Sequence, residues 1–450
     1  MIDYAIRSQR MVIDGEIKPA TVIIENGQFK KILPVDVQVN CAVDDFGNQV
    51  ILPGLVDCHV HINEPGRTDW EGFNTATQAA AAGGITTLVD MPLNCIPVTI
   101  DKSALVEKLE AIEGKLWVDC GFWGGVVPDS IDDLDELLAA GVLGVKSFLI
   151  DSGIEEFPNV KAEDLRKAMP ILAKHKKPYL IHAELDKDET PAAAIGDKYQ
   201  SFLASRPKQW ENDAIELMIE LADECKAKGH DCRVHIVHLS SAEALDMIQS
   251  AKQRGLSVTA ETCPHYLTLF AENIPDGKTL FKCCPPIRED ANREVLWDAV
   301  KTGLIDFIVS DHSPCTPTLK HIDSGDLENA WGGISALQFG LPLIWTEAKQ
   351  RGLDLTDLAN LMAEKTADFA GLGDTKGKIA PGYQADFLVF DDQLSYQIDN
   401  SMIKHRHKIT PYETKTVYGR ILKTVVRGRT VFDNEEFIGQ PIGQALLKQS

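Results

Sequence analysis

Short apolar segments recur along the middle of the chain, with helix-like segments between several of them. Eight of them follow one another between residues 54 and 314: "GLVDCHVHI", "ITTLVDMP", "KLWVDCGFWGG", "VLGVKSFLI", "KPYLIHAEL", "CRVHIVHLS", "LSVTAETCPHYL" and "IDFIVSDHSP". The stretches "IDDLDELLAA", "AEDLRKAMPILAKH", "DAIELMIELADECKAKG" and "SAEALDMIQSAKQRG" repeat apolar residues with a helical period. This alternation predicts a (β/α)8 TIM-like barrel. An open doubly wound sheet is the alternative, but no G-x-G-x-x-G turn follows an early strand.

Both ends of the chain differ from this middle because they contain short strands joined by turn residues. The stretch "TVIIENGQFKKIL" places an Asn-Gly pair between two apolar runs, which predicts a β-hairpin. The C-terminal stretches "ADFLVFD" and "TVYGRILKTVVRGRTVF" have the same character. We therefore expect an α/β protein in which residues 1–51 and 378–450 form one small composite β-sandwich and residues 52–377 form the barrel.

Charge and cysteine content bear on the partners and the compartment. The 450-residue chain has 45 lysines and arginines against 67 aspartates and glutamates, a net charge of −22. Such a chain is a poor partner for nucleic acids and for anionic membrane surfaces. The ten cysteines include no C-x-x-C pair, which suits reduced thiols in a cytoplasmic enzyme. Because no apolar run reaches about 18 residues and the N-terminus lacks an apolar segment, we expect neither a membrane span nor a secretory signal.

Side chains that can bind metals recur where the predicted barrel strands end, which is where barrel enzymes carry their catalytic groups. His59 and His61 end the first strand and share one side of it, because alternate residues of a strand point the same way. The other candidates end the fourth, fifth, sixth and eighth strands: Lys146, His182, His238 and Asp311. Imidazole and carboxylate together suit zinc, iron, manganese or cobalt, so we predict a metal centre at the barrel mouth.

Each of these residues also has an ordinary structural interpretation when it is taken alone. An H-x-H pair can arise from packing, and a single buried histidine is more often a hydrogen-bonded core residue than a ligand. We expect that core role for His235 and His265, and a supporting role around the centre for Asp90 and His312. The metal interpretation is favoured because suitable side chains recur together on five strands.

Lys146 does not fit a metal site as an ammonium, because an ammonium repels cations. Its neutral amine could instead react with carbon dioxide to give a carbamate. We therefore hypothesise that Lys146 is N6-carboxylysine, an anionic ligand with two oxygens that is long enough to bridge two metals.

The motifs "PGLVDCHVH", "IHAE", "VHLS" and "SDHSP", with Lys146, resemble those of the amidohydrolase superfamily, in the branch that hydrolyses cyclic amides. That branch includes dihydroorotases, hydantoinases (dihydropyrimidinases) and allantoinases. The resemblance extends from "ILPGLVD" to "GKIAPGYQADFLVFD", nearly the whole chain. It implies a metal-dependent barrel with a composite β-sandwich. It also implies a homo-oligomer, because members tend to form tetramers or dimers.

The resemblance further implies a centre of two divalent metals, with zinc expected first and iron, manganese or cobalt as alternatives. The implied ligands are His59, His61 and Asp311 for the first metal, His182 and His238 for the second, and carboxylated Lys146 for both. Such metals lower the pKa of water to about 7 and so supply hydroxide to the ring carbonyl. Asp311 is the implied catalytic residue, which takes the water proton and returns it to the leaving nitrogen.

Within the branch, this sequence is most similar to the allantoinases, through "HVHINEPGRTDWEGF", "DMPLNCIPVT", "GFWGGVVP", "FLIDSGIEEFP" and "ENAWGGISALQ". The implied reaction is hydrolysis of allantoin to allantoate in purine catabolism. Asn63 stands where dihydroorotases have an arginine that pairs with the substrate carboxylate, which favours a neutral cyclic ureide here. Asn63 could contact the ureido arm of allantoin or could cap the "EPGR" turn.

Further substrate contacts are expected from segments that line the site in this family. The candidates are Asn63, Asn94, Gly153, Cys283 and Ser313, with the backbone near Ser152. The alternative enzyme is a hydantoinase or dihydropyrimidinase acting on another ring. A dihydroorotase and a non-catalytic homologue are further alternatives, although all six predicted metal ligands are present.

Overall fold

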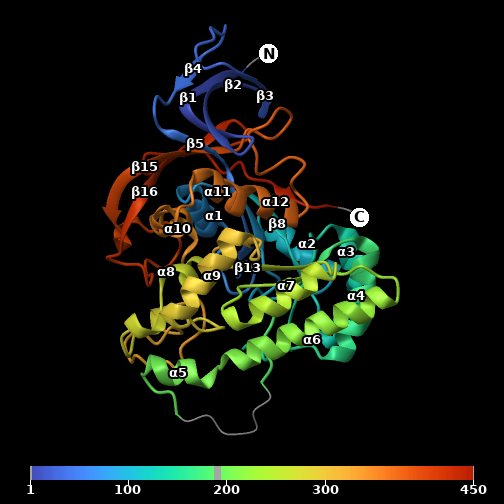
Figure 1. Ribbon diagram of the computed structural model, residues 1–450. Coiled ribbons are helices and arrows are strands. Elements are labelled where there is room, and N and C mark those ends of the chain that lie inside the picture. Colours follow the sequence, from blue (N-terminus) through green and yellow to red (C-terminus); the bar gives the residue numbers. More distant parts are fainter. Residues whose placement is uncertain (1–2, 187–193, 449–450) are drawn as a thin grey trace.

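Every predicted strand segment of the middle region forms part of the barrel. The computed structural model describes residues 3–186 and 194–448, with the barrel at one end and a separate sheet at the other (Figure 1). The barrel strands are β6 (Leu55–Val60), β7 (Ile85–Asp90), β8 (Asp119–Phe122), β9 (Gly124–Gly125), β10 (Val145–Phe148), β11 (Pro178–His182), β12 (Arg233–Ile236), β13 (Val258–Thr262) and β14 (Phe307–Ile308). The third predicted segment supplies both β8 and β9, so the eight-strand prediction is confirmed.

The barrel strands are parallel and form a closed ring. One run of pairings joins β6, β7 and β8, and a second joins β9 through β14 in chain order. The Leu143 N–H donates to the Phe122 carbonyl (2.9 Å), which joins the third and fourth strands. The ring closes where Val60 pairs in parallel with His312, and the His61 N–H donates to the His312 carbonyl (2.8 Å). Closure therefore places the two ends of the barrel sequence side by side.

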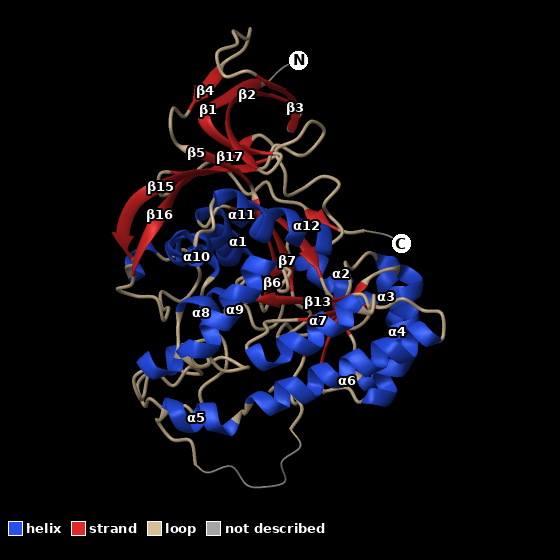
Figure 2. Cartoon of the chain, viewed as in Figure 1, coloured by secondary structure: helices blue, strands red, loops and turns tan. Residues whose placement is uncertain are grey.

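The helices lie around the outside of these strands (Figure 2). They are α1 (Phe73–Ala82), α2 (Lys102–Ala111), α3 (Leu134–Ala140), α4 (Ala162–His175), α5 (Tyr199–Ser205), α6 (Lys208–Ala227), α7 (Leu245–Gln253), α8 (Pro264–Thr268), α9 (Asp290–Thr302), α10 (Gly340–Ala348), α11 (Leu355–Ala359) and α12 (Lys365–Phe369). Helix α4 has the predicted bounds. It buries Leu165, Met169 and Leu172 on one face and has acidic residues in its first turn and basic residues in its last.

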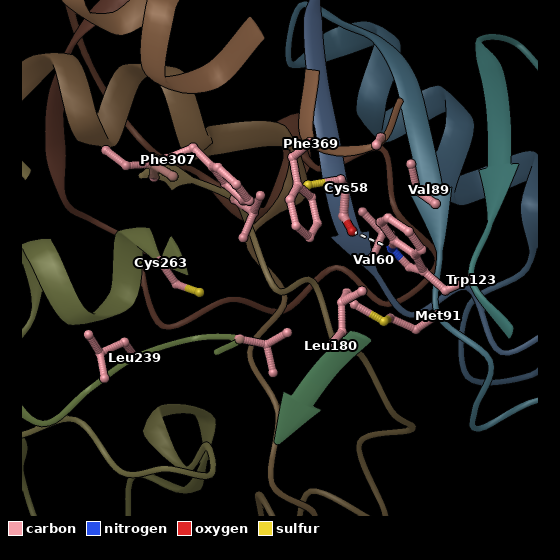
Figure 3. Close-up of a cluster of buried hydrophobic side chains, with 14 of the residues drawn as sticks. Cys58, Val60, Val89, Met91, Trp123, Leu180, Leu239, Cys263, Phe307 and Phe369 are labelled. Atoms are coloured by element: carbon pink, nitrogen blue, oxygen red, sulfur yellow. Dashed lines mark hydrogen bonds between the residues drawn. The ribbon is translucent and has the colours of Figure 1, made fainter. Parts of the chain in front are cut away.

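Buried apolar side chains fill the space between strands and helices, as Figure 3 shows for one cluster. The Trp123 indole is fully buried and donates its Nε1–H to the Cys58 carbonyl (2.7 Å), so its polar atom is satisfied. Its ring lies 5.8 Å from that of Phe369 in α12, which in turn lies 5.0 Å from Phe307 in β14. The aromatic rings thus connect the third and eighth strands of the barrel beneath the site.

The two ends of the chain share one sheet, as predicted. Its strands are β1 (Tyr4–Ile13), β2 (Glu16–Glu25), β3 (Gln28–Leu33), β4 (Val43–Asp45), β5 (Val50–Pro53), β15 (Phe387–Gln397), β16 (Thr416–Val426), β17 (Arg429–Asp433) and β18 (Glu436–Phe437). The N-terminal and C-terminal strands meet where Leu52 of β5 pairs with Leu388 of β15. Asn26 and Gly27 both have positive φ (54° and 73°), the conformation that the predicted hairpin turn between β2 and β3 requires. The domain boundaries at residues 51 and 378 stay a prediction.

The C-terminal segment also reaches the barrel. Strand β19 (Ala445–Leu446) pairs in parallel with β8, so the chain returns to the barrel after leaving the nine-stranded sheet. Near the same junction, the buried Lys376 ammonium lies 2.6 Å from both Asp119 of β8 and Asp386 next to β15. These contacts join the sheet and the barrel. Within the described residues, no helix is both long enough and apolar enough to cross a membrane.

Candidate metal centre

The six predicted metal ligands come together at the carboxyl ends of the barrel strands, and all are buried. His59 lies within β6, Lys146 within β10, and His182 is the last residue of β11. The others follow strand ends: His61 after β6, His238 after β12 and Asp311 after β14. Because the strands are parallel, their carboxyl ends share one edge of the barrel, which is why residues more than 200 positions apart meet there.

His59, His61 and Asp311 form one group of candidate ligands. One ligand atom from each of the three lies within 4.8 Å of the other two. The Asp311 Oδ1 is 3.2 Å from the His59 Nε2 and 3.8 Å from the His61 Nε2. The His61 Nδ1 donates to the Leu93 carbonyl (2.9 Å), so Nδ1 carries the proton. The lone pair of the His61 Nε2 is then free to bind a metal. Two neutral imidazoles and a carboxylate are suitable ligands for zinc and similar ions.

His182 and His238 form a second group. The His182 Nδ1 lies 3.0 Å from the His238 Nε2, and the His182 Nε2 lies 2.8 Å from the Glu184 carboxylate. The His182 ring stacks on Phe148 with its plane tilted by 14°, which fixes its orientation. The His238 Nδ1 is buried and has no hydrogen-bond partner among the residues described. Burial lowers the pKa of both imidazoles. They therefore stay neutral, and each has a nitrogen lone pair that can bind a metal.

Lys146 lies beside both groups. Its Nζ is 3.2 Å from the His59 Nε2, its one hydrogen-bond contact within residues 3–186 and 194–448, and 5.0 Å from the centre of the Phe148 ring. Its side chain is 1% exposed, and burial lowers its pKa. An ammonium has three protons to donate, so the charged form would be poorly satisfied here. Burial therefore shifts Lys146 toward its neutral amine, the form that can react with carbon dioxide, while the nearby Asp311 and Glu261 oppose this shift.

Two of the ligands and Asn63 have a backbone conformation that is uncommon for residues other than glycine. His238, Asp311 and Asn63 have φ values of 37°, 44° and 65°. Non-glycine residues with positive φ carry a conformational cost and cluster at functional sites. A strict alternation of side chains therefore does not continue past the ends of β6, β12 and β14. The predicted placement at the strand ends is right, but the local conformation could not be read from the spacing.

One pocket of about 450 Å³ opens onto this centre. Four of the five predicted substrate contacts line it: Asn94, Gly153, Cys283 and Ser313. Asn63 lies behind them, where its Oδ1 accepts from the Asn94 Nδ2 (3.2 Å) and its Nδ2 donates to the Pro314 carbonyl (3.2 Å). Its own carbonyl accepts the Arg67 N–H (3.1 Å) in the "EPGR" turn. Direct contact between Asn63 and a substrate stays a prediction, while its support of Asn94 is visible in the structure.

Glu261 in β13 is a supporting residue that the sequence analysis missed. Its carboxylate contacts the His59 Nδ1, lies 3.0 Å from the His235 Nε2 and accepts the His238 N–H (3.2 Å). It therefore holds a candidate ligand from each group. Burial raises the pKa of Glu261 to about 8, so a nearby positive charge is needed to keep it ionised. The available signal was a single acidic residue inside the apolar run "VTAET".

Glu184 and Asp57 support the centre in the same way. The Glu184 carboxylate joins His182 to the Arg206 guanidinium, whose Nε and Nη2 lie 3.0 and 2.6 Å away. The Arg206 guanidinium holds the pKa of Glu184 well below its usual range. The Asp57 carboxylate accepts the N–H groups of His59 (3.1 Å) and Ser310 (3.0 Å), which ties β6 to the segment that carries Asp311.

The structure confirms some of the roles expected for the other polar residues near the centre and not others. His235 is a hydrogen-bonded core histidine, as predicted, with its Nδ1 2.8 Å from the Thr259 hydroxyl. His265 is fully buried, but neither of its nitrogens has a partner among the described residues, so the expected hydrogen bonds are missing. Asp90 accepts the Ile62 N–H (2.9 Å), and the His312 Nε2 lies 3.2 Å from Glu71. Both therefore hold segments that flank the ligands.

Comparison with known proteins agrees with this fold and site. The family pattern described as "Amidohydrolase family" matches residues 50–431. The solved structure of an L-hydantoinase (dihydropyrimidinase) from Arthrobacter aurescens superposes with a TM-score of 0.91 and 27% identity, covering 100% of both chains. The chain belongs to the amidohydrolase family.

Two curated relatives give the narrower assignment. An allantoinase of Saccharomyces cerevisiae is 46% identical over 98% of each chain. An allantoinase of Streptomyces avermitilis is 45% identical over 100% of this chain and 99% of its own length. Within the amidohydrolase family, this chain belongs with the allantoinases.

Glu261→Gln tests the support that this carboxylate gives to the predicted ligands. We expect the variant to fold but to bind metal about 10- to 100-fold more weakly, because the amide cannot hold His59 as a carboxylate does. Competition with a chelator of known affinity measures this change. A metal affinity equal to that of the wild type would contradict the assigned role.

Proposed function

We propose that this chain hydrolyses a ring amide of allantoin to give allantoate, a step of purine catabolism. The likeness to allantoinases that carries this proposal extends over 98% or more of the chain, so it includes the segments that line the pocket. The pocket supports it, because one cavity brings Asn94, Gly153, Cys283 and Ser313 close to the predicted metal ligands.

The residues present fit two divalent metals. His59, His61 and Asp311 would hold the first metal, His182 and His238 the second, and Lys146 would contribute to both as N6-carboxylysine. Zinc is the first candidate and iron, manganese and cobalt are alternatives, because all accept imidazole and carboxylate ligands. When bound, the metals supply Lewis acidity that lowers the pKa of water and polarises the ring carbonyl. The proposal explains why the His182 Nδ1 and the His238 Nε2 face each other at 3.0 Å and why the Lys146 amine is poorly satisfied.

Asp311 is proposed to carry the proton. Burial raises its pKa, so the carboxyl group can hold a proton within the site. It would accept a proton from the attacking water and deliver it to the leaving ring nitrogen. The Oδ1 that contacts both His59 and His61 fixes the carboxyl group for this transfer.

The chemistry around Asn63 favours a neutral substrate. Asn63 and Asn94 offer amide groups, and no arginine occupies position 63. Dihydroorotases carry an arginine at this position to pair with the substrate carboxylate, and its absence here argues against that alternative. A hydantoinase acting on another neutral ring is the second candidate, since a solved L-hydantoinase superposes on this chain with a TM-score of 0.91.

We also propose that the chain acts as a homo-oligomer, a tetramer or a dimer, in the cytoplasm. All ten cysteines are free, which suits a reducing compartment. Gel filtration with light scattering gives the number of subunits.

Substrate comparison tests the proposed function. Purified, zinc-loaded protein should turn over allantoin with a kcat/KM at least about tenfold higher than for hydantoin, dihydrouracil or dihydroorotate, because the whole pocket would fit the ureide. Strong hydrolysis of dihydrouracil without any hydrolysis of allantoin would establish the hydantoinase alternative instead.

Lys146→Ala tests the carbamate. We expect kcat to fall by about 100-fold or more, because losing a ligand should cost at least as much as losing a residue that supports one. Added short carboxylic acids such as acetate or propionate should partly restore the rate by occupying the vacated volume. A Lys146→Ala enzyme that is fully active without added acid would refute the role of Lys146.

A further inference from the structure

Two buried lysines lie in one wall of the pocket that opens onto the predicted metal centre, and neither is a predicted metal ligand. Lys282 is 8% exposed and lines the pocket directly, while Lys320 is 3% exposed and lies behind the same wall. An unpaired buried ammonium is costly, so each needs a physical reason to be there. Their hydrogen bonds show that the reasons differ.

Lys320 is fully satisfied by the protein. Its Nζ donates to three backbone carbonyls, those of Lys282 (2.9 Å), Trp331 (2.8 Å) and Gly333 (2.5 Å). An ammonium has three protons, so no donor is left over. Because the three carbonyls belong to two segments that line the pocket, Lys320 joins those segments and has a structural role.

Lys282 is only partly satisfied. Its Nζ donates to the Glu328 carbonyl (3.0 Å) and lies 5.3 Å from the centre of the Phe202 ring, and in the described part of the chain it forms no ion pair. Its backbone is held on both sides, because its N–H donates to Thr279 (2.9 Å) and its carbonyl accepts from Gly333 (2.9 Å) and Lys320. Two donors of a well-positioned ammonium therefore remain for a ligand.

Arg206, another cation in this wall, is already paired with a carboxylate. Arg206 also lines the pocket, but its Nε and Nη2 bond to the two oxygens of Glu184. The Glu184 carboxylate neutralises the guanidinium. The two bonds from Arg206 hold Glu184 in position to contact His182. Among the described pocket residues outside the predicted metal centre, Lys282 is thus the cation without a carboxylate partner, and none of the six predicted metal ligands is its hydrogen-bond partner.

Lys282 and five of the six predicted metal ligands line the same pocket, so a substrate bound at the ligands could also reach Lys282. If the ring amide of allantoin reacts at the metals, the ureido arm must extend into the rest of the pocket. The carboxylate of the product would form from the ring carbonyl at the metals and would stay bound there, although it is attached to the same carbon as the arm. The group available to Lys282 is then the carbonyl oxygen of the arm, a good acceptor for an ammonium.

We propose that Lys282 donates a hydrogen bond to the ureido carbonyl of allantoin and so determines the preference for a ring that carries this arm. The proposal rests on the proposed function and names a contact beyond the metal centre and the five predicted contacts. Substrate and product both keep the arm, so Lys282 binds both and contributes to affinity throughout the reaction.

The test measures kcat and KM for allantoin in the full-length, metal-loaded wild type, Lys282→Met and Lys282→Arg. Lys282→Met should raise KM about tenfold and leave kcat within about twofold, because the bond is present in both ground and transition states. Lys282→Arg keeps a cationic donor and should stay within about threefold of the wild-type KM. An unchanged KM in Lys282→Met, or a fall in kcat at constant KM, would overturn the proposal.

Lys320→Met and hydantoin provide the matched controls. Hydantoin has the ring without the arm, so its inhibition constant should be the same in the wild type and in Lys282→Met. Lys320→Met should lower the Tm and weaken the binding of allantoin and hydantoin alike. Equal weakening of both ligands in Lys282→Met would overturn the assignment to the arm.

The experiment also distinguishes a variant that fails to fold from a failure of the proposed function. If Lys282→Met does not fold, as judged by its Tm, Lys282→Ala, which also removes the donor, takes its place against Lys282→Arg. A wild type that does not turn over allantoin would contradict the proposed function, whereas normal wild-type turnover with no effect of the substitution contradicts only the role of Lys282.

Discussion

Closure of the barrel is the constraint on which the site depends. The bond from the His61 N–H to the His312 carbonyl and the pairing of Val60 with His312 join strands that are about 250 positions apart in sequence. The Asp57 carboxylate strengthens the same seam by accepting N–H groups from both sides. His59 and His61 thereby come within reach of Asp311. Without this seam the first group of candidate ligands would not exist, however well each strand formed.

Burial gives the centre its chemistry. Burial lowers the pKa of Lys146 and raises the pKa values of Asp311 and Glu261, so each group is driven toward its neutral form. These imidazoles and carboxylates contact one another at the barrel mouth, while the Lys146 amine contacts only the His59 Nε2 among the described residues. Divalent metals would balance the carboxylates and would use the imidazole nitrogens that face one another. The polar composition of the barrel mouth is therefore best explained as a site built for cations.

Sequence reasoning succeeded where the determining pattern was local. The alternation in "DCHVH" follows from strand geometry, and the order of strands and helices is set by their periods, so the barrel and the positions of the candidate ligands could be predicted. Three features could not. The positive φ values of His238 and Asp311 depend on how the chain leaves its strands, and the contact of Glu261 with His59 depends on two strands that are distant in sequence. The pairing of β19 with β8 likewise involves two residues with no distinctive pattern.

The central claim is that six side chains hold two metals and that Lys146 joins them as a carbamate. A crystal structure of the metal-loaded protein, with anomalous scattering collected at the metal edge, tests it most directly. The account predicts two anomalous peaks, one bound by His59, His61 and Asp311 and the other by His182 and His238. It also predicts density for a carboxyl group on the Lys146 amine that reaches both peaks. A single ion, ions bound elsewhere, or an unmodified Lys146 between two ions would contradict it.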